Sequence, residues 1–292
     1  MLVVAYVIFA IFALVGLALI YTAEEERYVL CWSDEFDGPA GTSPDASKWT
    51  LVVGGNGFGN NELESYTDRP KNACLDGKGN LSINIFKETF TGPDNIKREY
   101  TSARLHTAGK FSQQYGRFEA RIKIPFGQGI WPAFWALGAN IDKVGWPDCR
   151  EIDIMENVGR EPSINNGSIH GPGYSGADGL TGKISLPDGK RLCDDFHTYA
   201  MEWDPESVRF FMDGQLYCTR TAKDVPGKKW DFDQPFFILL NVAVGGSWPG
   251  SPDETSTYPQ TMLVDYVRVY ADKTSRDLLH MVSPFVAYPY VG

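Results

Sequence analysis

Three carboxylates lie within six residues in the segment from Glu151 to Glu156, of sequence EIDIME. The isoleucines and the methionine favour a strand with one buried face. Successive side chains of a strand point to opposite faces, so Glu151 and Asp153 share a face and Glu156 belongs to the other. A β-bulge at Met155 or beside it would add one residue and return Glu156 to the face of the other two acids.

With such a bulge, about four strand steps separate the two glutamates, or roughly 13 Å between their Cα atoms. Side chains that lean toward each other would bring the carboxyl groups near ~5–5.5 Å, the separation that retaining hydrolysis of a glycosidic bond requires. The alternative is a solvated acidic face or half of a cation site. Aromatic residues flank the segment, and like charges clustered on one sheet face are destabilising, so both observations favour catalysis.

Segments typical of strands recur along the chain, and turn residues separate them. Asp213-Gly214 joins two of these segments and predicts a tight hairpin. No segment of similar length after the N-terminus has a helical period. The pattern predicts an all-β fold of two antiparallel sheets packed face to face, one with a concave face for ligand. The predicted strands are 81–86, 116–124, 151–156, 197–203, 208–212, 215–219, 236–244 and 262–270.

Aromatic residues flank the acids at two places. Trp131 and Trp135 are four residues apart, so a strand places both on one face, suited to stacking on sugar rings, with burial in the core as the alternative. Pro132 lacks an amide donor, which predicts an edge or irregular position. Trp248 lies in a loop rich in glycine and proline, where it would line the rim of a binding site or stack on Pro249.

Composition limits the class of ligand. The chain has 292 residues and a net charge of −10. A surface this acidic argues against a nucleic-acid partner, whose phosphates need basic residues, and suits a neutral ligand such as a polysaccharide. The four histidines do not have the spacing of metal ligands, which argues against a zinc enzyme.

The N-terminus predicts export. Residues 1–20 carry no charge and are almost all apolar, so 1–23 is either a signal peptide or a membrane anchor, and the rest of the chain lies outside the cytoplasm. Residues 24–271 would form one domain and 272–292 a C-terminal tail. An exported chain with five cysteines permits two disulfides. The expected pairs are Cys31–Cys74 and Cys193–Cys218, with Cys149 as the free thiol.

An ordered series of motifs resembles glycoside hydrolase family sixteen, in its laminarinase-like branch of endo-β-1,3-glucanases. The resemblance extends from about residue 31 to residue 271 and implies a jelly-roll β-sandwich of the concanavalin A type, with an open cleft across the concave sheet. The motifs are WSDEF at 32–36, GNNEL at 59–63, YTSAR at 100–104, GIWPAFW at 129–135, EIDIMEN at 151–157, IHGPGY at 169–174, DFH at 195–197, NVAVGG at 241–246 and VDYVRVY at 264–270.

The resemblance also implies roles for individual residues. Glu151 matches the nucleophile, Asp153 the assisting carboxylate and Glu156 the general acid/base. No cofactor is expected for catalysis, but the family often carries a structural calcium, for which Asp265 and backbone carbonyls near Glu35 and Gly79 would be ligands. The residues that resemble substrate-cleft positions are Asn61, Arg104, Trp131, Trp135, His170 and Trp248.

The expected activity is endo-acting, retaining hydrolysis of β-1,3-glucan or of mixed β-1,3/1,4-glucan by a monomer. Two alternatives stay open: a transglycosylase that remodels cell walls, and a glucan-recognition protein without catalysis, although the three retained acids weigh against the second. Two departures from the family pattern lie near the cleft. Phe58 replaces a frequent tryptophan, and Glu64 replaces a frequent glutamine.

Overall fold

The computed structural model describes residues 27–187 and 189–273. The expected signal peptide or anchor at 1–23 and the tail beyond residue 273 lie outside this range. Among the described residues, the helices are all too short and too polar to cross a membrane. They are α2 (Ile141–Val144) and the two 3-10 turns η1 (Gly176–Asp178) and η2 (Ala222–Asp224). Strands make up nearly all the remaining regular structure.

The larger sheet has ten strands, and its pairs are antiparallel except for the last one. Eight of them lie in the order β15 (Gln215–Thr221), β14 (Ser207–Met212), β13 (His197–Trp203), β8 (Gly116–Lys123), β17 (Gln260–Asp272), β5 (Leu81–Thr91), β6 (Lys97–Ser102) and β3 (Glu64–Tyr66). In addition, β1 (Tyr28–Asp34) pairs with β17, and β4 (Ala73–Leu75) pairs with β5.

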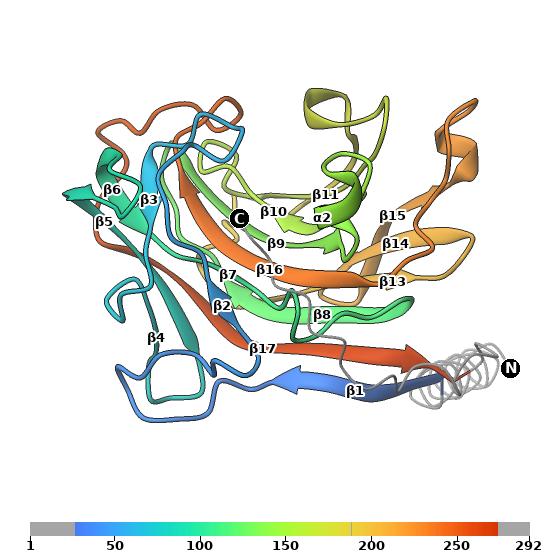
Figure 1. Cartoon of the computed structure of the whole chain (residues 1–292), viewed down its shortest axis with the longest axis horizontal. Helices are drawn as coiled ribbons and strands as arrows, with labels where there is room; N and C mark the ends of the chain where they lie inside the picture. The colour runs from blue at the N-terminus through green and yellow to red at the C-terminus, as the bar shows by residue number, and fades with distance from the viewer. Residues whose placement is uncertain (1–26, 188, 274–292) are drawn as a thin grey trace, which may run out of the picture.

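The smaller sheet has seven strands, all of its pairs are antiparallel, and it carries the acidic segment at its centre. Figure 1 shows it curving above the larger sheet, with its concave side turned away from that sheet. The strand order is β12 (Leu180–Ser185), β11 (Ile164–His170), β10 (Glu151–Glu156), β9 (Ile130–Gly138), β16 (Phe236–Val244), β7 (Arg104–His106) and β2 (Thr50–Leu51).

One hydrophobic core joins the two sheets. Phe118 and Ile122 of β8 and Val267 of β17 are fully buried in it, together with Phe134 of β9 and Ile152 of β10. Because side chains alternate along a strand, burial of Ile152 toward the other sheet directs Glu151 and Asp153 to the opposite face. The two-sheet sandwich predicted from the sequence is confirmed, and the core fixes which face carries the acids.

An edge position for Pro132, one of the two positions expected, is wrong. Pro132 lies inside β9, a central strand, where it pairs with Val242. The ladder between β9 and β10 ends one residue away, at Ala133, so proline is accommodated beside the end of a ladder. The position Asp213-Gly214 is a two-residue hairpin turn as expected, with both residues at positive φ (50° and 76°).

The expected disulfides are also wrong, since all five cysteines are unpaired. The Cys31 thiol, on β1, donates to the carbonyl of Val269 at 3.2 Å. The Cys218 side chain packs against Gly182 of β12, where an added Cβ would meet its sulfur at 2.3 Å. These thiols are therefore directed into neighbouring backbone. Cys149 is buried and free, as expected.

Candidate active site

A β-bulge in β10 places the third acid. Asp153 pairs with Trp135 of β9, but Met155 pairs with Phe134, so Ile154 is the extra residue. On the other side, Glu151 and Glu156 lie opposite His170 and Asn166. Those partners are four positions apart on β11, so the two glutamates share a face about four strand steps apart, or ~13 Å between Cα atoms. The bulge predicted from the sequence is confirmed.

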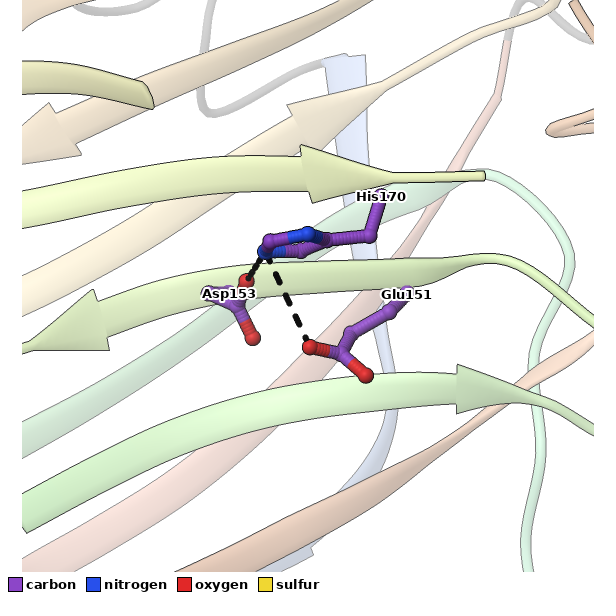
Figure 2. Close-up of side chains that lie close together, drawn as sticks. All are labelled: Glu151, Asp153 and His170. Atoms are coloured by element: carbon purple, nitrogen blue, oxygen red, sulfur yellow. Dashed lines mark ion pairs between the residues drawn. The ribbon is translucent and has the colours of Figure 1, made fainter. Parts of the chain in front are cut away.

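Glu151, Asp153 and His170 form one cluster, and Figure 2 shows the imidazole ring of His170 lying over the two carboxyl groups. Nε2 of His170 is 2.9 Å from Oδ2 of Asp153 and 3.8 Å from Oε1 of Glu151. Gly179 makes room for the ring, because a Cβ there would lie 2.2 Å from Cε1 of His170. The histidine therefore lies within ion-pair distance of both acids, without a hydrogen bond to Oδ2 of Asp153.

Each glutamate accepts a hydrogen bond from a tryptophan. Nε1 of Trp131 donates to Oε1 of Glu156 at 3.0 Å, and Nε1 of Trp146 donates to Oε2 of Glu151 at 2.8 Å. Trp131 belongs to β9, whereas Trp146 lies in the β9–β10 connection and is 48% exposed. Each indole donor fixes the orientation of its carboxyl group and leaves the second carboxyl oxygen for other partners.

Burial and mutual repulsion raise the pKa values of all three acids. Burial, followed by the charge of Asp153, raises the pKa of Glu151 to about 8, and His170 and the Trp146 hydrogen bond oppose this rise. Burial raises the pKa of Asp153 to about 7. Burial, with the charges of Asp153 and Glu151, raises the pKa of Glu156 well above its usual range. The cluster therefore holds a proton at neutral pH, as a general acid must.

The expected cleft residues lie on the same sheet or in loops beside it. The Trp131 and Trp248 rings meet edge to face at 5.3 Å. The Arg104 guanidinium lies over the Trp135 ring at 4.7 Å and over the Phe58 ring at 5.2 Å.

Nδ2 of Asn61 donates to the Ser247 hydroxyl at 2.9 Å, so two loops distant in sequence meet at this edge. Both strand tryptophans are half-buried, whereas Phe134 is in the core.

Sequence reasoning missed two groups beside the site. Trp146 gave a signal, a tryptophan before a proline five residues upstream of Glu151, but its contact depends on how the β9–β10 connection folds back. Asn241 of β16 accepts a hydrogen bond from Nε1 of Trp135 at 2.7 Å, a contact that only the pairing of β9 with β16 creates.

The comparisons with known proteins agree with this arrangement. Residues 65–268 match the family model described as "Glycosyl hydrolases family 16". The chain belongs to glycosyl hydrolase family 16. It is therefore a glycoside hydrolase by family, and the resemblance inferred from the motifs is confirmed.

Individual relatives in family 16 cover most of the chain. A β-glucanase from Rhodothermus marinus is 41% identical over 276 residues, which cover 90% of this chain and 93% of the relative. A glucan endo-1,3-beta-glucosidase from Cryptopygus antarcticus is 36% identical over 258 residues, covering 82% of this chain and 91% of the relative. The X-ray structure of an endo-β-1,3-glucanase from Pyrococcus furiosus superposes with a TM-score of 0.79 at 46% identity, covering 84% and 95% of the two chains.

Proposed function

We propose that the protein is an endo-acting, retaining hydrolase of β-1,3-glucan or of mixed β-1,3/1,4-glucan. The observation that carries the proposal is the bulge at Ile154, which places Glu156 on the face of Glu151. The spacing suits a pair of carboxyl groups that act on one glycosidic bond, one as the nucleophile and the other as the proton donor. The names of the family 16 relatives from Rhodothermus and Cryptopygus support a glucan as the substrate.

In this mechanism, Glu156 donates its proton to the glycosidic oxygen while Glu151 attacks the anomeric carbon and forms a glycosyl-enzyme. The leaving sugar departs with that proton. Glu156, now a carboxylate, then takes a proton from a water molecule that displaces Glu151 from the anomeric carbon, and the product keeps the β configuration. The Trp131 hydrogen bond to Glu156 holds the acid in the direction needed for both steps.

Asp153 and His170 adjust where the proton resides. Asp153 is 2% exposed, and a charge there disfavours ionisation of both glutamates. The contact of His170 with Asp153 and Glu151 compensates part of that repulsion. We infer that these two residues keep Glu151 ready to ionise while Glu156 keeps its proton, and that the three acids titrate as one coupled system.

The substrate would lie across the concave face, over Trp131, Trp135 and Trp248. Indole rings stack on the apolar faces of sugars, and the edge-to-face pair of Trp131 and Trp248 offers such a surface beside Glu156. Asn61, Arg104 and His170 offer donors for sugar hydroxyls. A neutral polysaccharide also suits the net charge of −10.

Reducing-sugar release from laminarin by residues 24–292 tests the proposal, beside Glu151→Gln and a control, Trp230→Phe. Trp230 donates its indole N–H to the carbonyl of Pro205, which lies in the turn between β13 and β14. We expect activity in the wild type and the control, and near-complete loss in Glu151→Gln. A wild type that binds laminarin and releases nothing would leave glucan recognition as the function, and products longer than the starting oligosaccharide would indicate transglycosylation.

We also propose a structural calcium at Asp265, with backbone carbonyls near Glu35 and Gly79. Asp265 lies at a bulge in β17, between Val264 and Tyr266, which takes its backbone out of the ladder with β8. Such a position suits a calcium ligand, but its carboxylate also binds Arg121 at 2.7 Å, and the Glu35 carboxylate binds Arg268 at 2.8 Å. An unchanged melting temperature with excess chelator would remove this proposal.

We infer further that residues 24–271 act as a monomeric unit outside the cytoplasm, after a signal peptide or anchor in 1–23. The family match from 65 to 268 and the uncharged residues 1–20 support this division. Fractionation of cells that express the full chain, followed by size-exclusion chromatography of residues 24–292, tests it. Activity confined to the cytoplasm, or elution as a dimer, would contradict it.

A further inference from the structure

A chain of three hydrogen bonds connects Trp135 with a buried carboxylate. Nε1 of Trp135 donates to Oδ1 of Asn241 at 2.7 Å, and Nδ2 of Asn241 donates to the Tyr66 hydroxyl at 3.1 Å. The Tyr66 hydroxyl donates to Oε2 of Glu62 at 2.9 Å. Tyr66 is 0% exposed and Glu62 3% exposed, so water does not replace these bonds easily.

The acidic end of the chain sets the direction of every bond in it. A carboxylate only accepts, so the single Tyr66 proton must point toward Glu62. The Tyr66 oxygen then has only lone pairs left for Asn241, which must present its NH2 group there. The amide oxygen of Asn241 consequently faces Trp135 and accepts the indole N–H. A side chain at position 62 that could also donate a hydrogen bond to the Tyr66 oxygen would no longer fix the direction of the other bonds in the chain.

Glu64 allows Glu62 to remain the acceptor. Glu64 is 0% exposed, and the Val244 amide donates to its Oε2 at 2.6 Å. Burial, then the charge of Glu62 and a hydrogen bond with it, raises the pKa of the Glu64 carboxyl well above its usual range. A neutral Glu64 avoids a second charge beside Glu62. The charge of Arg104 acts on Tyr66 and opposes the rise of its pKa.

Trp135 links the chain to the catalytic strand. It lies directly opposite Asp153 in the β9–β10 ladder, and its ring carries the Arg104 guanidinium at 4.7 Å. A rotation of the indole would therefore move both a sugar-stacking surface and the cation on it. This step rests on the proposed function, in which Trp135 contacts glucan.

We propose that Glu62 and Tyr66 are positioning residues, which hold the Trp135 indole in its glucan-binding orientation through Asn241. Neither residue touches the sugar in this account. Their contribution to binding passes through Trp135, so removing the Tyr66 hydroxyl matters only while the indole N–H is present.

A double-mutant cycle between Tyr66→Phe and Trp135→Phe tests the proposal through KM and kcat on laminari-oligosaccharides. We expect each single variant to raise KM about 5- to 10-fold, the range of one hydrogen bond, with a smaller change in kcat. The double variant should have the KM of Trp135→Phe alone. Tyr199→Phe is the matched control, because Tyr199 is equally buried and its hydroxyl has no hydrogen-bond partner in the described part of the chain.

Glu62→Gln and Glu64→Gln extend the test with conservative changes. Glu62→Gln can donate to Tyr66, so it should raise KM as Tyr66→Phe does. Glu64→Gln stays neutral and should keep the wild-type KM at neutral pH. Independent, additive effects of Tyr66→Phe and Trp135→Phe on KM, or an unchanged KM in Tyr66→Phe, would overturn the proposal. A wild type without hydrolytic activity would instead refute the proposed function itself.

Discussion

Trp146 donates its indole N–H to Oε2 of Glu151 at 2.8 Å, although the tryptophan lies in a connecting segment and is 48% exposed. The donor stabilises the ionised form of a carboxyl group whose pKa burial raises to about 8. In the proposed mechanism Glu151 must be ionised to attack the anomeric carbon. The connection between β9 and β10 therefore contributes to the reactivity of the nucleophile.

Trp146→Phe should consequently move the acidic limb of kcat/KM to higher pH. Loss of a buried hydrogen bond to a charged group costs roughly 1.5–3 kcal/mol. Because Trp146 is partly exposed, we expect the lower end of that cost, which corresponds to a rise of about one unit in the pKa of Glu151. We expect about 10-fold lower kcat/KM below pH 6 and a smaller loss above pH 8. A pH profile of the variant beside Trp230→Phe measures this. An acidic limb at the wild-type position would contradict the role of Trp146.

Glu151→Gln should stabilise the fold at high pH. The folded pKa of Glu151 is about 8 and its ordinary value is 4.5, so between these values the folded state binds more protons than the unfolded state. Stability from this group is present below pH 4.5 and is lost as pH rises through 8. One pKa unit corresponds to about 1.4 kcal/mol, and we expect the variant to gain at least that amount over wild type near pH 9.

Thermal melts at pH 4.5 and pH 9 check this prediction. The melting temperature of Glu151→Gln should match that of wild type at the lower pH and exceed it by at least about 3–6 °C at the higher pH. Glu99→Gln is a surface control, because burial does not raise the pKa of that acid above its usual value. An equal difference at both pH values would mean that Glu151 titrates normally.

Deleting Met155 should preserve the geometry of the acids. Removing one residue of the bulge at Ile154 and Met155 would leave the sequence EIDIE, in which regular alternation places all three acids on one face. The loss of a buried side chain would destabilise the fold by about 2–5 kcal/mol, so the variant should be less stable yet active. Deletion of Ile152 leaves the bulge and turns Glu151 to the other face, which should abolish activity.

Circular dichroism and laminarin hydrolysis on both deletion variants measure this. A folded Met155 deletion as inactive as the Ile152 deletion would mean that the bulge does more than restore the face of Glu156. It would then also set the distance or angle between the two glutamates.

Local patterns predicted much of the fold. Strands β10, β13 and β16 have the bounds expected from the sequence, because each is an apolar or alternating run between turn residues. The turn at Asp213-Gly214 followed from the positive φ that such a pair adopts. The bulge was predictable because side chains alternate along a regular strand, so Glu156 would otherwise lie on the face opposite to Glu151 and Asp153. These features depend on neighbours in sequence.

What the sequence did not predict depends on contacts between distant segments. The missing amide donor of Pro132 predicts an edge or irregular position, and the end of the β9–β10 ladder at Ala133 accommodates it in a central strand. Export predicts disulfides without fixing their partners, whereas the sheet directs Cys31 toward the Val269 carbonyl. The hydrogen-bonded chain of Glu62, Tyr66 and Asn241 connects the two sheets, so no pattern of neighbouring residues in the sequence predicts it. Motif resemblance supplied the roles of the acids, and strand periodicity alone did not distinguish nucleophile from acid.

The most direct test of the central claim is to trap the glycosyl-enzyme. Residues 24–292 would be incubated with an activated 2-deoxy-2-fluoro laminaribioside, which slows hydrolysis of the intermediate, and the modified peptide would be identified by mass spectrometry. The account predicts one covalent sugar on Glu151 and none on Glu156. A label on Glu156, or hydrolysis of the same substrate to the α-anomer without any covalent adduct, would contradict it.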